Sequence, residues 1–283
     1  MGMLFFVARR FVAGERLAGA IESVRALNDR GLLATLDFLG EDVRSRDEAL
    51  RTRDMYFAMI DAIGAARVRA NLSVKLSALG LLIAPQLAID NLRAIVERNG
   101  SAADPFVRID MERSTLVDAT LNVFEETYRS HGNVGPVLQA YLKRTPADVE
   151  RVVGLGARIR LCKGAYHEPA SIAIRDIDAL RAQYLTIAGV MLRGARYPAF
   201  ATHDKRLIRE LRRMADEHHV TAQSFEFQML YGVRPKLQRE LVRAGYGVRV
   251  YVPFGTHWAS YFYRRVTERR ENALFALRSL LPW

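Results

Sequence analysis

Eight short apolar segments of this chain end in polar or charged residues. These residues are Asp37, Lys75, Asp110, Gln139, Arg160 with Lys163, Thr202 with His203, Glu226 with Gln228, and Tyr251. A charged side chain is costly to bury unless it is paired or binds a ligand. A single polar residue at a strand end is unremarkable, because it can be solvated. Eight segments that end in this way favour a polar, functional cavity.

A second group of candidate residues follows the last of these segments. Its members are Tyr261, Arg264, Arg265 and Glu268. Their helical spacing puts them on one face of a helix. Two adjacent guanidinium groups are suited to grip a carboxylate with paired hydrogen bonds. Arg-Arg pairs occur elsewhere in the chain, and an Arg–Glu pair on a helix is usually a solvated surface pair. The position directly after the eighth segment nevertheless favours a role in binding an anionic substrate or cofactor.

Several other kinds of site find no support in the sequence. The six histidines show no paired ligand spacing, so we expect no metal site. There is no P-loop and no nucleophile elbow. The segment from Gly154 to Gly156 lacks the third glycine of a dinucleotide-binding fingerprint, and it enters a strand where the fingerprint leaves one. The single cysteine, Cys162, cannot form an internal disulfide, which suits a reducing compartment.

Short apolar runs alternate with longer segments of helical spacing along the whole chain. The expected strands are Leu33–Leu39, Leu72–Leu76, Phe106–Met111, Val137–Tyr141, Arg158–Lys163, Ala199–Thr202, Ser224–Met229 and Val248–Pro253. The clearest helices are Asp47–Ala66, Ala147–Val153, Lys205–His218 and Arg234–Ala244, and an extra helix is expected over Ala13–Asn28. Alternation predicts a parallel sheet, and eight strands predict a closed barrel. We therefore expect one α/β domain over residues 1–283, a single (β/α)8 TIM-type barrel with a C-terminal helix over its mouth.

The chain is basic, with a net charge of +11 from 42 Lys and Arg against 31 Asp and Glu. The arginines are scattered along helical segments and do not alternate with aromatic residues, so nucleic-acid binding is not expected. A solvated, arginine-rich surface is the simplest interpretation, and weak attraction to an anionic membrane is the second. No run of about eighteen uncharged apolar residues is present. We expect a cytoplasmic protein, with peripheral contact to the inner face of the cell membrane.

The segments at the strand ends resemble those of the proline dehydrogenase family, the flavin enzymes of proline catabolism. The matching segments are TLDFLGE (35–41), SVKLSALG (73–80), RIDME (108–112), VLQAYLKRT (137–145), RLCKGAYHEP (160–169), ATHD (201–204), FEFQMLYG (225–232), VRVYVPFG (248–255) and YFYRRVTE (261–268). The combination of KGAY with YxxRRxxE is the most specific part. Because no aldehyde dehydrogenase half is present, the chain resembles the short, monofunctional bacterial type.

The resemblance implies a site for L-proline. In the family, residues that match Lys75, Arg264 and Arg265 hold the proline carboxylate, and three cations around one carboxylate suit a buried anion. Asp110 matches a family aspartate and is expected to orient Lys75 or a tyrosine. Family tyrosines that pack against the substrate ring match Tyr166, Tyr251 and Tyr261. The predicted catalytic residues are Lys75, Asp110, Tyr251, Arg264 and Arg265.

The resemblance also implies bound FAD. The residues expected to line it are Gln139, Arg160, Lys163, Gly164, Ala165, Thr202, His203, Gln228 and Glu268. Arg160 is expected near N5 and O4 of the isoalloxazine, where a cation stabilises charge on the reduced flavin. Lys163 is expected nearer the phosphates. A further basic residue is expected to reach the pyrophosphate, with Arg175 and Arg181 as the candidates.

The reaction implied by the resemblance is hydride transfer from C5 of proline to flavin N5. It gives Δ1-pyrroline-5-carboxylate in the first step of proline catabolism, and the electrons pass to an acceptor that is usually a membrane quinone in the family. No candidate residue is an obvious general base. Two alternatives stay open: a Schiff-base barrel with Lys75 as the nucleophile, and a basic barrel that only binds RNA or a membrane. The sequence does not separate proline from hydroxyproline, and it gives no oligomeric state.

Overall fold

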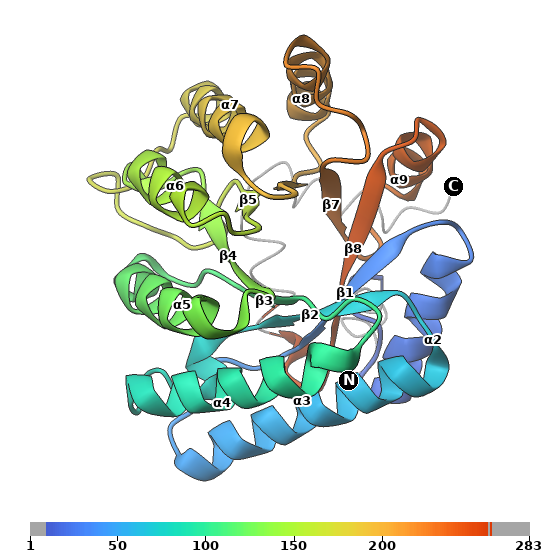
Figure 1. The fold of residues 1–283 in the computed structure, drawn as a ribbon, viewed down its shortest axis with the longest axis vertical. Coiled ribbons are helices and arrows are strands. Elements are labelled where there is room, and N and C mark those ends of the chain that lie inside the picture. Colours follow the sequence, from blue (N-terminus) through green and yellow to red (C-terminus); the bar gives the residue numbers. More distant parts are fainter. Residues whose placement is uncertain (1–9, 260, 262–283) are drawn as a thin grey trace.

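The chain forms a closed barrel of eight parallel strands with helices around its outside (Figure 1). The computed structural model describes residues 10–259 and residue 261. Neighbouring strands pair in chain order, and the last strand closes the barrel by pairing with the first. The strands are β1 (Leu33–Phe38), β2 (Ala70–Val74), β3 (Val107–Ile109), β4 (Val134–Gln139), β5 (Arg160–Cys162), β6 (Ala199–Ala201), β7 (Glu226–Leu230) and β8 (Gly247–Phe254). The predicted (β/α)8 TIM-type barrel is confirmed.

The strand ends differ from the predicted ones by up to three residues. β2 ends at Val74 because the chain turns at once into a short 3-10 helix, η1 (Leu76–Leu79). Gly80 ends η1 with a φ of 101°, and a Cβ at this position would lie 2.6 Å from Cδ2 of Leu87. Only glycine combines this backbone conformation with such close packing. As a result Lys75 lies just beyond the strand and not inside it.

Four polar residues that were predicted at strand ends lie elsewhere in their strands. Arg160 is the first residue of β5, and Gln228 is the third of the five residues in β7. Glu226 is the first residue of β7, and Tyr251 is the fifth residue of the eight in β8. Strands in a barrel are staggered, so the alternation of side chains along one strand does not show how high a residue lies in the barrel. The placement of Glu226 at a carboxyl end was therefore wrong.

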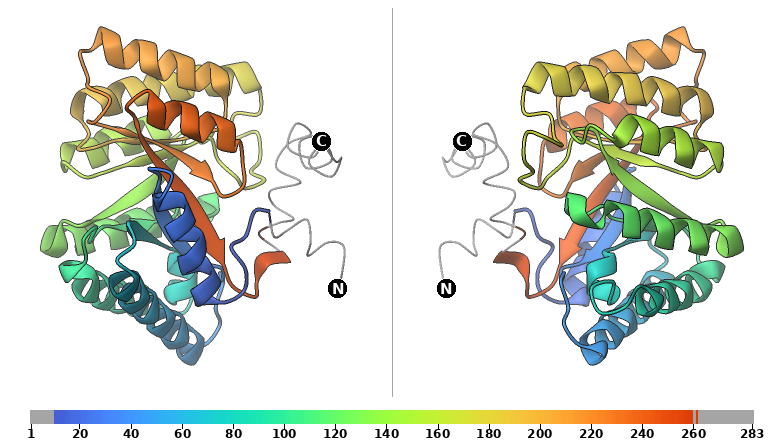
Figure 2. Two further views of the ribbon diagram at one scale, coloured as in Figure 1. Left: turned by 90° about the vertical axis from the view of Figure 1, so that its right-hand side faces the viewer. Right: turned by 90° about the vertical axis from the view of Figure 1, so that its left-hand side faces the viewer.

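Helices connect the successive strands, and one more precedes the barrel. They are α2 (Leu17–Asn28), α3 (Arg46–Ala66), α4 (Pro85–Arg98), α5 (Val117–His131), α6 (Thr145–Gly154), α7 (Ile177–Gly194), α8 (Lys205–Glu217) and α9 (Pro235–Arg243), with short 3-10 helices η2 (Asn99–Ser101) and η3 (Ser114–Leu116). The predicted N-terminal helix begins at Leu17 and lies at the side of the barrel, against β1 and β8 (Figure 2). The helix predicted over the barrel mouth lies outside the described residues. In the part of the chain that is described, no helix is long and apolar enough to cross a membrane.

Capping residues explain where two of the helices begin. Before α3, the Ser45 hydroxyl accepts a hydrogen bond from the backbone N–H of Glu48, and the Glu48 carboxylate accepts one from the N–H of Ser45. Before α8, the Asp204 carboxylate accepts from the N–H of Arg206. Such a cap contributes about 1 kcal/mol, because it satisfies an N–H that has no partner inside the helix.

The apolar core lies between the strands and the surrounding helices. Leu36, Leu72 and Phe200 on three of the strands are fully buried there, and each such side chain contributes about 2 kcal/mol by leaving water. The inside of the barrel is different. Arg160 on β5 donates to Gln228 on β7, and these strands are not neighbours, so the contact crosses the interior. The interior is therefore polar at this level, where such barrels usually hold branched apolar residues.

Candidate active site

Lys75 lies in a buried cluster of charges where β1, β2, β3 and β8 approach the barrel mouth. Its ammonium donates to both carboxylate oxygens of Asp37 at 3.0 Å. Oδ2 of Asp110 lies 3.7 Å from the same nitrogen, and the Tyr251 hydroxyl lies at 3.5 Å. Lys75 is 7% exposed and Asp37 is fully buried. With Arg160, these four residues form what we call the mouth cluster.

The register of the sheet explains why these residues meet. Asp37 on β1 is paired with Ser73 on β2, so Lys75 follows two residues later on the same face of the sheet. The N–H of Asp110 donates to Val74 O, which fixes the chain directly after β3 beside the end of β2. The carboxyl ends of parallel strands meet at one edge, and this edge is where barrel enzymes bind their ligands.

The pKa values of Asp37 and Lys75 in the mouth cluster are shifted by burial and by the neighbouring charges. Burial raises the pKa of Asp37 to about 6, although Lys75 opposes the shift. Burial alone would lower the pKa of Lys75, but Asp37 and Asp110 outweigh it and raise the pKa above its usual range. Lys75 is therefore a protonated cation. A Schiff-base nucleophile needs a lysine with a lowered pKa, so this arrangement argues against the Schiff-base alternative.

Asp110 connects the other members of the mouth cluster. Its carboxylate accepts hydrogen bonds from the Tyr251 hydroxyl at 2.6 Å and from the Ser73 hydroxyl at 2.7 Å. It also accepts one from Nη1 of Arg160 at 2.8 Å. Burial alone would raise the pKa of Asp110, but Lys75 and Arg160 hold it below its usual range. The ionised carboxylate thus orients a tyrosine and an arginine, while the main partner of Lys75 is Asp37.

Arg160 is held on several sides inside the barrel. Besides its bond to Asp110, its Nε donates to Oε1 of Gln228 at 2.5 Å. Its guanidinium carbon lies 5.4 Å from the centre of the Tyr251 ring. Within the described residues its second terminal nitrogen, Nη2, makes no hydrogen bond. A buried cation with two N–H donors to spare on one nitrogen is suited to contact an electron-rich ligand at the mouth.

Gln139 ends β4 with a buried acceptor that finds no partner among the described residues. Its side-chain nitrogen donates weakly to the carbonyl oxygens of Met111 and Glu112, both at 3.3 Å. The amide oxygen Oε1 is buried and accepts no hydrogen bond from residues 10–259 or 261. A buried polar atom is seldom left unsatisfied, so Oε1 of Gln139 marks a place where a ligand donor fits.

The loop after β5 comes close to a neighbouring aromatic ring. Gly164 has a φ of 118°, and a Cβ at this position would lie 2.2 Å from Cδ1 of Tyr141. Ala165 and Tyr166 follow in the same loop and are half-buried. The loop therefore presents backbone, without a side chain at position 164, at the carboxyl end of the barrel. Close approach of backbone to a ligand is a common reason for such a glycine.

Lys163 belongs to a second charged group around Asp204. The Asp204 carboxylate accepts from Lys163 Nζ at 2.6 Å and from Arg181 Nε at 2.8 Å. Burial opposes ionisation, but these two cations outweigh it and hold the pKa of Asp204 far below its usual range. Arg175, by contrast, is exposed and donates to the Glu168 carbonyl at 3.4 Å. Of the two arginine candidates, Arg181 is the one that lies beside Lys163.

Thr202 and His203 lie between this group and β7. The Thr202 hydroxyl accepts from the N–H of Asp204 at 3.1 Å. Nε2 of His203 accepts from the N–H of Leu230 at 2.9 Å. Because Nε2 is an acceptor here, the neutral ring carries its proton on Nδ1. The pair thus has a fixed orientation at the carboxyl end of β6.

Tyr261 is the one residue of the predicted C-terminal group that the structure describes. It is buried and packs with Val12 and Leu39, close to Tyr251. Arg264, Arg265 and Glu268 lie outside the described residues, and their roles stay predictions.

Sequence reasoning gave no site role to three residues that the structure places in the mouth cluster, beside it, or in the group around Lys163. Asp37 was noted as polar but was not recognised as the partner of Lys75. Asp204 could have been found, because a carboxylate just before a long helical segment is a typical N-cap. Ser73 gave no such indication, because a serine in the middle of a strand has no pattern that sets it apart.

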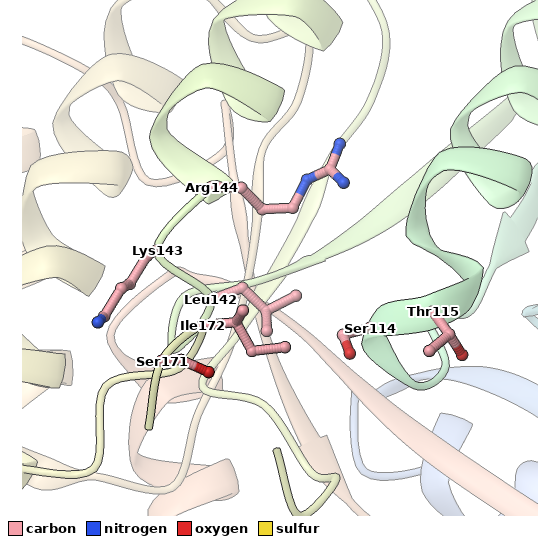
Figure 3. A pocket seen from close by; sticks show the side chains of 7 residues that line it. All are labelled: Ser114, Thr115, Leu142, Lys143, Arg144, Ser171 and Ile172. Atoms are coloured by element: carbon pink, nitrogen blue, oxygen red, sulfur yellow. The ribbon is translucent and has the colours of Figure 1, made fainter. Parts of the chain in front are cut away.

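A separate pocket lies at the rim of the barrel (Figure 3). Its volume is about 390 Å³, and it lies between the loops that follow β3, β4 and β5. The residues that line it are Ser114, Thr115, Leu142, Lys143, Arg144, Ser171 and Ile172. None of the predicted site residues is among them. Among the residues described, no group of His, Cys, Asp or Glu is arranged to hold a metal ion.

The chain is similar to known proteins over most of its length. The family model described as proline dehydrogenase matches residues 20–278. Proline dehydrogenase 1 of Bacillus subtilis (strain 168) is 40% identical over 274 residues, which cover 97% of this chain and 90% of the relative. The proline dehydrogenase of Deinococcus radiodurans is 38% identical over 280 residues, with the same coverage.

A solved structure shows the same fold. Proline utilization A (PutA) from Bdellovibrio bacteriovorus, inactivated by N-propargylglycine, superposes with a TM-score of 0.87 at 24% identity. The match covers 96% of this chain and 34% of the PutA chain, so this chain spans about a third of that protein. On the strength of the family match over most of its length and of its close relatives, the chain belongs to the proline dehydrogenase family.

Proposed function

We propose that this chain oxidises L-proline to Δ1-pyrroline-5-carboxylate with bound FAD, as the first step of proline catabolism. The observation that carries the proposal is the mouth cluster, in which Lys75, Asp110, Arg160 and Tyr251 meet at the carboxyl end of a barrel from this family. A cation for a carboxylate and a cation for an electron acceptor lie side by side there, bridged by Asp110.

Lys75 binds the substrate carboxylate in this proposal. A buried ammonium keeps its charge only near anions, and in the substrate-free protein Asp37 and Asp110 supply them. The proline carboxylate joins this group, together with Arg264 and Arg265 of the C-terminal segment. Burial raises the pKa of Asp37 to about 6, so Asp37 can give up negative charge by taking a proton when a second carboxylate arrives.

The tyrosines form the walls around the substrate ring. Tyr251 donates to Asp110 at 2.6 Å, which fixes the direction of its ring. Tyr261 packs beside it, and Tyr166 lies in the loop after β5. Aromatic faces suit the apolar faces of a pyrrolidine and exclude water from the reacting carbon.

FAD fits the residues around β4 to β7. When bound, the flavin supplies N5 as the acceptor of the hydride from C5 of proline. The unsatisfied Oε1 of Gln139 accepts a donor of the ring, and Arg160 places positive charge beside it. Gly164 and Ala165 let the backbone come close, while Lys163 and Arg181 carry charge for the phosphates. Thr202, His203, Gln228 and Glu268 complete the expected binding set.

The ring nitrogen must be neutral at the moment of hydride transfer, because its lone pair drives the step. The cations of the site favour loss of that proton by lowering the pKa of the bound ammonium. Asp110 accepts hydrogen bonds from Ser73, Arg160 and Tyr251, so it is poorly placed to act as the base. We assign no general base. The electrons pass on to a quinone-type acceptor, which fits a cytoplasmic protein with peripheral contact to an anionic membrane.

An anaerobic absorbance spectrum tests the proposal. The protein is loaded with FAD and mixed with L-proline, with D-proline and lactate as controls and hydroxyproline as a close analogue. We expect flavin bands that bleach with L-proline and not with the two controls. Protein treated with N-propargylglycine, which inactivated the PutA of Bdellovibrio bacteriovorus, should no longer turn over L-proline. Flavin that stays oxidised with L-proline would refute the substrate, and a protein that takes up no FAD would refute the function.

A further inference from the structure

A chain of hydrogen bonds connects the mouth cluster with charges deeper in the barrel. Arg249 Nε donates to both oxygens of Glu226, at 2.9 and 3.1 Å. The side-chain nitrogen of Gln228 donates to Oε1 of Glu226. Oε1 of Gln228 then accepts from Nε of Arg160, which donates onward to Asp110. All five side chains come from different positions on β3, β5, β7 and β8 or directly after them.

Each hydrogen bond in this series can run in only one direction. An ionised carboxylate only accepts hydrogen bonds, and a guanidinium only donates them. Burial alone would raise the pKa of Glu226, but Arg249 outweighs it and holds the pKa below its usual range. Glu226 is therefore ionised and requires the nitrogen of the Gln228 amide. The oxygen of that amide must then face Arg160.

This series of hydrogen bonds fixes the orientation of Arg160 but adds no charge to the mouth cluster. The mouth cluster contains two cations, Lys75 and Arg160, and two carboxylates, Asp37 and Asp110. The charge of Glu226 is matched deeper in the barrel by Arg249, and a neutral amide separates the two groups. A carboxylate in the place of that amide would leave the mouth cluster with an excess negative charge. Such a charge, close by in a medium of low dielectric constant, has a large effect.

We propose that Glu226 and Arg249 are positioning residues for Arg160, and that Gln228 holds the guanidinium in place while it keeps the compensating carboxylate away from the flavin site. This inference rests on the proposed function. Reduction adds negative charge to the flavin, so a carboxylate moved up to Arg160 disfavours reduction and also weakens the binding of the anionic substrate.

The test exchanges two side chains without changing composition. In the double variant Glu226→Gln/Gln228→Glu, the new glutamate accepts from Arg160 and from the new glutamine, whose oxygen accepts from Arg249. The net charge stays the same, and the carboxylate moves next to Arg160. One of the two hydrogen bonds from Arg249 Nε is lost, because the new glutamine has a single side-chain oxygen. A purely structural role of these residues predicts no effect on flavin reduction. Glu112→Gln is the matched control, because this carboxylate is also buried but bonds to Ser77 and not to Arg160.

The FAD-loaded proteins are equilibrated anaerobically with a reference dye, and FAD dissociation, the KM for proline and the thermal midpoint are measured alongside. We expect the equilibrium constant for flavin reduction to fall at least tenfold in the double variant, about 30 mV for a two-electron couple. The KM should rise more than kcat falls, and the thermal midpoint should stay close to that of the wild type. Glu112→Gln should leave the reduction equilibrium within twofold.

An unchanged reduction equilibrium in a folded, FAD-loaded double variant would overturn the inference while leaving the proposed function intact. A wild-type protein that binds no FAD would overturn both. If the double variant does not fold, Gln228→Glu alone brings the same charge to Arg160. That variant should show the same fall, and a pH dependence as well, because two adjacent carboxyl groups share a proton. An unchanged equilibrium in that variant would also overturn the inference.

Discussion

The two ends of the barrel interior stabilise their buried charges in different ways. In the mouth cluster, Lys75 and Arg160 are paired with the carboxylates of Asp37 and Asp110. At the other end lies a base cluster with three arginines and two acidic residues, Arg108, Arg158, Arg249, Asp104 and Glu226. There the guanidinium of Arg108 donates to the carbonyls of Pro136 and Arg158, at 3.0 and 2.7 Å. It also stacks on Phe106 at 4.6 Å.

The charges of the mouth cluster are available to a ligand, whereas those of the base cluster serve packing. Within the described residues Arg108 has no carboxylate partner, and burial with the nearby arginines holds its pKa well below the usual range. Its stabilisation comes from backbone oxygens and an aromatic face, which no ligand needs to displace. In the mouth cluster each charge is balanced by other side chains, and in the proposed function these exchange partners when a substrate carboxylate arrives. The same residue types therefore serve different purposes at the two ends.

Removing the central cation should give the largest effect. In Lys75→Met, Asp37 is left buried without its main partner, which costs about 3–5 kcal/mol of unfolding free energy. The value of kcat/KM for proline should fall by at least about 100-fold, because the substrate carboxylate loses a charged donor. Urea unfolding and steady-state kinetics measure the two quantities. Adding Asp37→Asn should recover part of the stability and none of the activity; recovery of both would contradict the assigned role of Lys75.

Substitution of two glycines, one at each end of the barrel, tests the difference between the ends directly. A Cβ at Gly164 would lie 2.2 Å from the Tyr141 ring, and one at Gly135 would lie 2.1 Å from the carbonyl oxygen of Arg158. Gly164→Ala and Gly135→Ala should each destabilise by roughly 1–3 kcal/mol through strain. Only Gly164→Ala should also weaken FAD binding, by about tenfold, which corresponds to about 1.4 kcal/mol. Gly64→Ala, in the open on α3, is the control and should stabilise by about 0.5–1 kcal/mol. Equal loss of FAD affinity in both barrel variants would erase the distinction.

Ionisation of Asp37 should contribute to the pH dependence of the free energy of unfolding. Burial raises its pKa from 3.8 to about 6 in the folded protein. The protonated form is then favoured by folding, so this contribution is complete below pH 4 and is lost as the pH rises to 6. Relative to Asp37→Asn, the wild type should lose stability over that window, by up to about 1.4 kcal/mol per pH unit. Urea unfolding at several pH values measures the difference. A constant difference between the two proteins would show that the carboxylate is not strained by burial.

The smallest effect should come from the base cluster. Arg108→Met keeps much of the side-chain volume and leaves two carbonyls without this donor, at a cost of about 1–2 kcal/mol. Because Arg108 balances no carboxylate in the described part of the chain, kcat for proline should stay within about threefold of the wild type, in line with a packing role. A much larger fall in kcat at unchanged stability would mean that the two clusters are coupled through Arg108.

The sequence predicted the fold well because each strand and helix carries its own local pattern. The alternation of apolar runs with helical spacing gave the barrel, and most strands appear within a few residues of their predicted positions. β2 shows where this fails: Leu76 and Leu79 continue the apolar run, but they form η1 after the strand. Their apolar character is the same in both conformations, so only packing against neighbouring elements distinguishes the two.

For the site, the residue types could be predicted but not their partners. Lys75, Asp110 and Arg160 stood out as charges next to apolar runs, because burying them is costly. That Asp37 is the main partner of Lys75, and that Arg160 reaches Gln228 across the barrel, could not be read from spacing. The members of these two pairs are separated by 38 and by 68 positions in the sequence. They meet only once the register of the strands is set.

The sequence by itself determined the architecture and the identity of the charged residues, because hydrophobic period and the cost of buried charge are local properties. The tertiary structure decided the pairing of those charges, the polar interior of the barrel and the direction of the Gln228 amide. These depend on the stagger of eight strands, which is a property of the closed barrel and of no single segment.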